Sequence, residues 1–255
     1  MPKFKSLKKP LLSKEIEEEL TASIRGGIYK LGDKLPTEKE MVEQLEVSRS
    51  TLREALKNLE SNGLITIRRG MHAGAYVAEP NPLPIIKSFK NLIQTKKGNI
   101  LDLIESRLYI EPVVVKIAAI HRTEADIERL KDILDQAEGL VNTSLKNARV
   151  MNVHFHNELA KITQNPIMMF LCESMIEVFE TLLVELTHDN LDKKAIRKPI
   201  LEHRGILEAI AEKNPEEASK RTKHHLLNAL HTYSKIIPEK ADAYIKKCNN
   251  YFYKL

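Results

Sequence analysis

The stretch LPTEKEMVEQLEVSRSTLREALKNLESNGLITIRRGMHAGAYV, Leu35–Val77, predicts two short helices followed by a β-hairpin. Thr37 stands three residues before Glu40, the spacing of a capping box, so we expect a helix to begin at Glu38. Its apolar stripe would consist of Met41, Val42 and Leu45. The link Glu46-Val47 that follows is so short that it predicts a sharp turn.

A second helix is expected after Ser48, whose hydroxyl can cap its N-terminus, and it should end at Asn62-Gly63. Its buried face has helical spacing and consists of Leu52, Ala55, Leu56 and Leu59. Its outer face carries Arg49, Ser50, Arg53 and Lys57. Such a helix can enter the major groove of DNA, where an arginine reads guanine through two hydrogen bonds.

The hairpin would join strands at 64–67 and 75–77 through a tip that contains Arg68, Arg69 and Gly70. A helix-turn-helix followed by a basic hairpin is a winged helix. Charge alone is equally consistent with an ordinary solvated surface, because the net charge of +5 and the pI near 9.0 occur in many other proteins. The order of the motifs, and not the charge, favours DNA as the partner.

These residues resemble the GntR superfamily of bacterial transcription regulators. The LP-[ST]-E start, the VSR, the LREAL and the L-x-x-x-GL patterns all occur in order and at the family's spacing between Leu35 and Ile65. The resemblance implies a DNA-binding regulator with an N-terminal winged helix-turn-helix.

Composition sets further limits on the class of protein. No apolar run approaches the ~20 residues of a membrane helix, and no secretory signal follows the start MPKFKSLKKP. Cys172 and Cys248 lack paired spacing, which favours a reducing cytoplasm over a disulfide framework. The absence of Trp and the abundance of Leu, Ile, Ala, Glu and Lys favour a mainly α-helical fold.

We divide the 255-residue chain into three parts. Residues 1–78 form the DNA-binding domain, which opens with a helix from Ser13 to about Tyr29. The buried stripe of that helix would be Ile16, Leu20, Ile24 and Ile28. Residues 79–98 form a linker and connecting segment, because AEPNPLP at 78–84 contains three prolines.

Residues 99–255 predict an all-α bundle of six or seven helices, because caps and breaks recur at regular intervals. The expected helices cover about 100–121, 123–142, 144–163, 165–188, 192–213 and 214–238, with a seventh at 240–253. A helical bundle behind a winged helix resembles the FadR-type subgroup of the family, whose C-terminal module is the ligand-binding FCD domain.

Three histidines face the interior of this bundle. His156, His203 and His225 each share a helix face with residues three, four or seven positions away that are apolar or small. Two arrangements would explain this spacing. One is a set of separate core histidines, each with its own hydrogen bonds, and the other is a shared metal site. A divalent cation would offset the cost of burying three imidazoles together.

The resemblance favours the metal. FCD members have Asp-x-x-x-His on one helix and one His on each of two later helices, which together bind a divalent metal. Here Asn152 stands where the family has Asp, while His156, His203 and His225 match. We therefore predict a site for Zn, Ni, Mn or Fe formed by these four residues, with Asn152 as a weak ligand because its amide carries no charge. His154 and His224 should lie on the surface.

Arg107 and Glu111 stand four residues apart on an otherwise apolar helix face, which is compatible with an internal salt bridge. The same residues match the first helix of the FCD domain, where the arginine lies near the effector. Arg107 is therefore expected to bind the carboxylate of a small organic acid.

The combined prediction is a transcriptional regulator, most simply a repressor, that binds a palindromic operator as a homodimer and is not an enzyme. DNA contacts are expected from Lys39, Arg49, Ser50, Thr51, Arg53, Arg69 and Gly70. A regulator with a structural or sensed metal and no organic effector is the alternative. A metal-dependent hydrolase is a remote third reading, because no acidic general base is evident beside the histidines.

Overall fold

The computed structural model describes residues 11–186, 192–235 and 244–248. The chain divides into two compact units, Met1–Pro84 and Ile85–Leu255. Within the described ranges, no helix combines the length and apolar character of a membrane span. The predicted fold class, a winged helix-turn-helix followed by an all-α domain, is confirmed.

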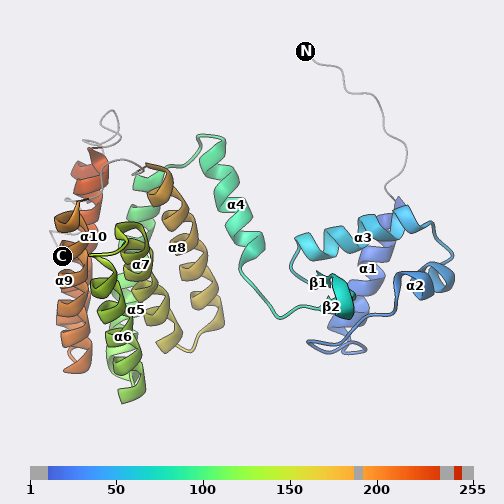
Figure 1. Ribbon diagram of the computed structural model, residues 1–255, viewed down its shortest axis with the longest axis horizontal. Coiled ribbons are helices and arrows are strands. Elements are labelled where there is room, and N and C mark those ends of the chain that lie inside the picture. Colours follow the sequence, from blue (N-terminus) through green and yellow to red (C-terminus); the bar gives the residue numbers. More distant parts are fainter. Residues whose placement is uncertain (1–10, 187–191, 236–243, 249–255) are drawn as a thin grey trace, which may run out of the picture. The chain divides into compact units, whose positions relative to one another are not determined.

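The N-terminal unit contains three helices and a two-stranded hairpin (Figure 1). These elements are α1 (Leu11–Arg25), α2 (Glu38–Leu45), α3 (Arg49–Ser61), β1 (Ile65–Arg68), the 3-10 turn η1 (Gly70–His72) and β2 (Gly74–Val77). Their shared core consists of Ile16, Leu20, Leu35, Met41, Leu52, Ala55, Leu56, Leu59, Ile65, Ala75 and Val77. The helix-turn-helix and the hairpin therefore fold around one apolar centre.

The predicted boundaries of α1 were wrong at both ends. This helix begins at Leu11 instead of after Ser13, and it ends at Arg25 because Gly26 and Gly27 follow, Gly27 with a φ of +78°. Ile28 therefore lies beyond the helix and is 72% exposed, although it was expected in the buried stripe.

The ends of α2 and α3 are as predicted. Thr37 and Glu40 form both hydrogen bonds of a capping box, and Glu46 ends α2 in the left-handed conformation with a φ of +52°. The Ser48 hydroxyl accepts from Thr51 N at the start of α3. Gly63, with a φ of +74°, turns the chain from α3 into the hairpin.

The hairpin is an antiparallel pair in which Ile65 lies opposite Val77 and Arg68 lies opposite Gly74. The segment before α2 extends the pair, because Leu35 N donates to Ala75 O at 2.8 Å. A short η1 turn at the tip was not expected from the sequence.

The C-terminal unit consists of α4 (Leu83–Gln94), α5 (Ile100–His121), α6 (Glu124–Leu140), α7 (Leu145–Ile162), α8 (Pro166–Leu186), α9 (Lys193–Ala211) and α10 (Pro215–Ser234). Helix α4 starts two residues before the division of the two units. Residues 244–248 are helical, but the rest of the predicted seventh helix and the end of the predicted fourth lie outside the described residues.

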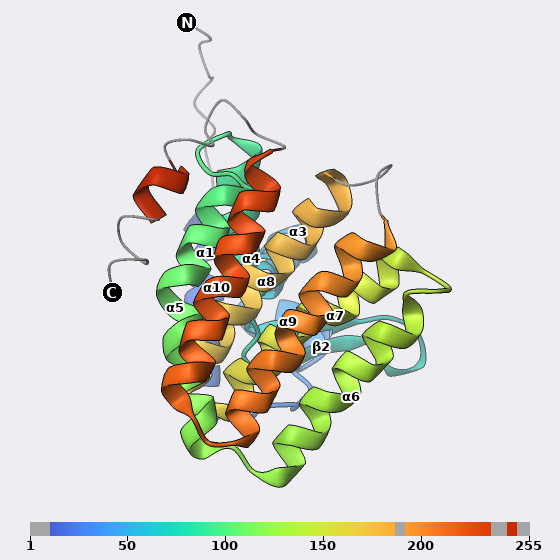
Figure 2. The same ribbon diagram turned by 90° about the vertical axis from the view of Figure 1, so that its left-hand side faces the viewer.

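The helices from α5 to α10 run roughly parallel or antiparallel to one another, and α6 packs against α7, α7 against α8 and α9 against α10 (Figure 2). Short capped turns set this arrangement, as at Thr123, which forms a capping box with Asp126, and at Asn214, which caps α10 before Pro215. Helix α9 runs toward the turn at 212–214 and α10 returns alongside it. His203 on α9 lies beside His225 on α10. Because the two helices are antiparallel, a residue two turns before His203 lies at the same height in the bundle as a residue two turns after His225.

Candidate functional site

The residues predicted to contact DNA lie on α2, α3 and the tip of the hairpin. Six of them are exposed, namely Lys39, Arg49, Ser50, Arg53, Arg69 and Gly70, whereas Thr51 is partly buried. The apolar face of α3 is buried, with Leu52, Ala55 and Leu59 fully inaccessible. One face of α3 is thus anchored in the core while its basic face is open to solvent.

Hydroxyl groups cluster at the N-terminus of α3. Ser48 Oγ lies 2.9 Å from Ser50 Oγ and 2.7 Å from Thr51 Oγ1, and it accepts from Thr51 N at 3.2 Å. Because the N-terminus of a helix carries a partial positive charge, this cluster is suited to a backbone phosphate.

Two arginines of the unit have intramolecular contacts. Arg53 Nε donates to Glu38 Oε2 at 2.8 Å, in a pair whose side chains are 69% and 43% exposed. The guanidinium carbon of Arg68 lies 4.3 Å from the centre of the Tyr76 ring, so this side chain is held against the hairpin. Arg69 is at the tip, where Gly70 has a φ of +84°, a conformation that favours glycine.

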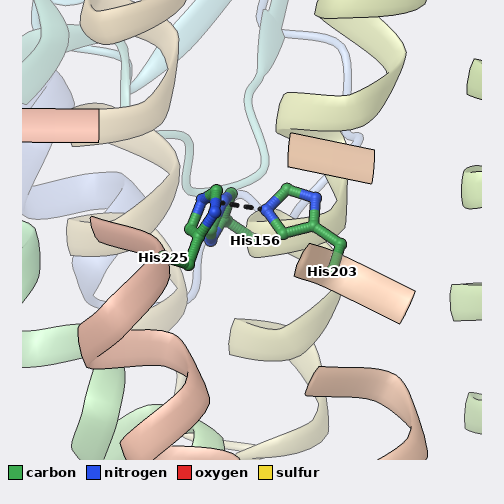
Figure 3. Close-up of side chains that lie close together, drawn as sticks. All are labelled: His156, His203 and His225. Carbon is green, nitrogen blue, oxygen red and sulfur yellow. Dashed lines mark hydrogen bonds between the residues drawn. The ribbon is translucent and has the colours of Figure 1, made fainter. Parts of the chain in front are cut away.

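The three predicted histidines meet inside the helical unit. His156 on α7, His203 on α9 and His225 on α10 are 5%, 1% and 5% exposed, and one ring nitrogen from each lies within 4.8 Å of the others (Figure 3). His203 Nε2 and His225 Nε2 are 3.0 Å apart. His154 and His224, expected at the surface, are both exposed.

An oxygen atom faces the Nδ1 atom of each ring. Asn152 Oδ1 lies 2.8 Å from His203 Nδ1, and Glu202 Oε2 lies 2.7 Å from His225 Nδ1. Glu111 Oε2 lies 2.8 Å from His156 Nδ1, without the alignment of a regular hydrogen bond. At His203 and His225 these oxygens can hold the Nδ1–H tautomer and leave the Nε2 lone pair for a metal.

The protonation states agree with this arrangement. Burial lowers the pKa of His156 to about 4, and burial together with His225 holds the pKa of His203 well below its usual value. Burial alone would raise the pKa of Glu111, but Arg107 and His156 hold it below the ordinary range. At neutral pH His156 and His203 are therefore neutral imidazoles and Glu111 is an ionised carboxylate.

The close approach of His203 and His225 allows either a hydrogen bond between the two rings or a shared metal ion, depending on the tautomers. If Asn152 and Glu202 each accept a hydrogen bond from Nδ1–H, the two Nε2 lone pairs face one another at 3.0 Å. A metal ion bonded to both nitrogens would remove that repulsion. The residues present therefore fit a divalent metal.

Arg107 is buried in an ion pair beside the histidines. Its Nε donates to Glu111 Oε1 at 2.5 Å, and its guanidinium lies 4.6 Å from the centre of the Phe179 ring. The internal salt bridge allowed by the sequence is therefore present, and Arg107 also lines a cavity of about 360 Å³ together with all three histidines. The structure is therefore compatible with Arg107 as part of an internal salt bridge and with Arg107 as a contact for an effector carboxylate.

Comparison with known proteins identifies both units. The model of the gntR family of bacterial regulatory proteins matches residues 12–77, and the FCD domain model matches residues 102–228. The Uxu operon regulator of Haemophilus influenzae is 32% identical over 84% of this chain and 78% of its own length. This chain belongs to the GntR family.

Other GntR proteins resemble it over most of their length. The repressor NanR of Cronobacter sakazakii is 29% identical over 90% of this chain and 88% of its own. A solved structure of a Streptococcus agalactiae GntR protein is 26% identical, with a TM-score of 0.63, and covers 85% of this chain and 98% of its own. These proteins are transcriptional regulators, so the expectation that this chain is not an enzyme is confirmed.

Sequence reasoning did not assign roles to Glu111 and Glu202 as partners of the histidines. Glu111 was noted only as the partner of Arg107, and Glu202 was not singled out. One local signal was available for Glu111, since an acid on an apolar helix face requires buried partners. The pairing of Glu202 with His225 joins two helices, and the sequence contained no signal for it.

Proposed function

We propose that this GntR-family regulator is a repressor whose operator binding is controlled by a small carboxylate bound beside a divalent metal in the FCD domain. The observation that carries the proposal is the set of three outer oxygens that turn three imidazoles toward one space beside Arg107. Separate core histidines would also have hydrogen-bond partners, but their remaining ring nitrogens would not need to converge within 4.8 Å of one another.

In this proposal His156, His203 and His225 hold the metal. The sequence also predicts Asn152 as a ligand, but its oxygen lies on the Nδ1 side of His203. The two nitrogens of an imidazole point in diverging directions, so an oxygen bonded to Nδ1 does not reach a metal on Nε2. We therefore propose that Asn152 orients His203 and would ligate the metal directly only after its oxygen left Nδ1.

The effector would occupy the cavity that Arg107 and the histidines line. The metal, when bound, supplies a positive charge for one carboxylate oxygen. Arg107, fixed by Glu111 and Phe179, can supply hydrogen bonds to the same carboxylate. A carboxylic acid fits this end of the cavity better than a neutral ligand.

On DNA, we propose that Arg49 and Arg53 read bases or hold phosphates, that Ser50, Thr51 and Lys39 contact the backbone, and that Arg69 and Gly70 reach the adjacent minor groove. One recognition helix covers only a few base pairs, so a homodimer on a palindromic operator is expected. Effector binding would shift the population away from the DNA-competent dimer through residues 79–98. We place this activity in the cytoplasm, where bacterial DNA lies.

A thermal-shift screen of small carboxylates, with divalent metal and with chelator, tests the proposal. We expect the melting temperature to rise when metal and acid are both present, and Arg107→Gln and His203→Ala to abolish the rise due to the acid. Operators selected from random DNA should then be released by the same acid.

The alternative is a regulator that senses a metal and no organic acid. Metal alone would then change operator affinity, and no carboxylate in the screen would alter either the melting temperature or DNA binding. That result would overturn the effector part of the proposal and leave the metal part in place.

A further inference from the structure

The tip of the hairpin exposes an apolar side chain among basic ones. Met71 is 94% exposed, the highest fraction among the large apolar side chains of the described residues. Arg69 stands just before Gly70 and His72 follows Met71, and both of these side chains are exposed as well. A single exposed apolar residue is ordinary on a protein surface. Met71, however, lies at the tip of a DNA-binding hairpin, so DNA bound by the tip would cover it.

The backbone of the tip is held in one shape. Ala73 N donates to Gly70 O at 3.0 Å and closes the η1 turn, and the Tyr76 hydroxyl donates to His72 O at 3.1 Å. The φ of +84° at Gly70 starts this turn and would be strained in a residue with a side chain. Met71 is therefore presented by a closed turn whose position is set by the two strands.

Two further cations lie on the hairpin beside the tip. Arg68 and Lys34 both contact the Tyr76 ring, and Lys34 Nζ lies 5.8 Å from the centre of that ring. Lys34 passes over Gly74, where an added β-carbon would lie only 2.6 Å from Lys34 Cε. A ring contact fixes a cation without neutralising its charge. Both side chains are exposed, so they suit the phosphate rows that border a minor groove.

The minor groove gives an apolar side chain a chemical reason to prefer one kind of base pair. A·T and G·C pairs both present acceptors there, but a G·C pair adds the N2 amino group of guanine, which is a donor. A thioether that covers this amino group removes its water and offers only a weak acceptor in return. An A·T pair has no such donor to bury. Apolar side chains flanked by basic residues do enter minor grooves in other DNA-binding proteins.

We propose that Met71 enters the minor groove and selects A·T over G·C pairs there, because it leaves the guanine amino group without a partner. Lys34 and Arg68 hold the neighbouring phosphates and so fix the depth of the tip. The inference rests on the proposed function, because it assumes that the hairpin lies in the minor groove. It adds a residue that reads sequence through burial, with no hydrogen bond to a base.

Inosine isolates the guanine amino group in the test. An I·C pair has the major-groove pattern of G·C but lacks the amino group in the minor groove. In an operator selected from random DNA, each A·T pair that flanks the half-sites is replaced in turn by G·C and by I·C. Fluorescence anisotropy at fixed salt then measures binding of the full-length protein. At one or more flanking positions we expect G·C to weaken binding about tenfold and I·C less than about twofold.

Substitutions at Met71 assign the effect to this side chain. Met71→Gln has nearly the same length and supplies an amide oxygen that accepts from the amino group, so the difference between G·C and I·C should fall below about twofold. Met71→Leu stays apolar and should keep most of the difference. Ile167→Gln, which replaces a 75% exposed apolar residue of the FCD unit, is the matched control and should behave as wild type.

The phosphate contacts have a different signature. Arg68→Gln should weaken binding to all operators alike and reduce the slope of log affinity against log salt by about one. The difference between G·C and I·C should remain in this variant. A loss confined to particular base pairs would overturn the phosphate role of Arg68.

The outcomes separate the inference from the proposed function. A G·C penalty that I·C shares, or one that is unchanged in Met71→Gln, overturns the role of Met71. The same holds if no flanking G·C pair weakens binding while Arg69→Gln still does. If neither the flanking G·C pairs nor Arg69→Gln changes the affinity, the hairpin does not reach the minor groove, and that part of the proposed function fails.

Discussion

Each unit of this protein contains an arginine paired with a glutamate, in opposite environments. Arg53 and Glu38 in the DNA-binding unit are 69% and 43% exposed, whereas Arg107 and Glu111 in the FCD unit are 2% and 5% exposed. Water screens the first pair, so its attraction is weak and a phosphate can compete for Arg53. The second pair is fixed by its surroundings, and its orientation can be transmitted to His156.

The difference bears on how each unit would recognise the ligand proposed for it. The charges of the DNA-binding unit are exposed, and the ligand proposed for them, DNA, is a polyanion. The FCD unit buries its charges before the ligand arrives, so the cost of dehydrating and orienting them is met during folding. Exposed charges on α3 should therefore affect affinity for DNA, whereas buried charges around the histidines should affect folding and binding together.

The largest expected effect comes from breaking the buried pair. Glu111→Gln leaves Arg107 in a buried site without its counter-charge, so we expect the free energy of unfolding of the FCD unit to fall by about 3–5 kcal/mol. The matched change Glu38→Gln in the exposed pair should lower the stability of its unit by less than about 1 kcal/mol. Urea titration with hydrogen exchange measured in α3 and α5 follows the two units separately. If Glu111→Gln and Glu38→Gln lower the free energy of unfolding of their units by the same small amount, the Arg107 site is hydrated.

An intermediate effect is expected on the exposed basic face of α3. Arg49→Ala should cost about 1–3 kcal/mol of specific operator binding if the side chain reads a base, with little change in folding stability. The affinity is best measured by fluorescence anisotropy on a selected operator at fixed salt. Arg197→Ala, an exposed arginine of the FCD unit, is the control. Unchanged operator affinity in Arg49→Ala would exclude the assigned role.

The smallest effect is expected from Asn152→Asp. A carboxylate on Nδ1 of His203 makes that imidazole more basic, so we expect roughly tenfold tighter metal binding. Metal content after purification and competition with a chelator measure the change. Asn147→Asp, which adds the same charge to an exposed position of α7, should have little effect. The same metal content in wild type, Asn152→Asp and His156→Ala would exclude the proposed site.

Much of the fold could be predicted because its signals are local. Thr37, Ser48 and Thr123 cap helices as expected, since a cap depends on residues within one turn. The same locality explains the error at the C-terminal end of α1, because Gly26-Gly27 is a helix stop that the apolar spacing of Ile24 and Ile28 obscured. Ile28 stands at helical spacing from Ile24, but it lies beyond the end of α1 at Arg25.

The site was predicted in outline and not in detail. Helical spacing alone indicated that His156, His203 and His225 face inward, and the family resemblance suggested that they meet. The orientation of each ring depends on its partner, which is Glu111, Asn152 or Glu202. Each partner lies on a different helix from the histidine it contacts, so the pairing forms only in the folded protein.

The sequence by itself therefore determined the family, the helix-turn-helix, the helical sensor domain and the inward faces of its helices. These properties depend on interactions within about four residues and on the periodicity of the α-helix. Only the tertiary structure decided the burial of Arg107, the orientation of the imidazoles and the reach of the cavity to Arg149. Those properties depend on hydration and on hydrogen bonds between residues up to 51 positions apart, which no local pattern specifies.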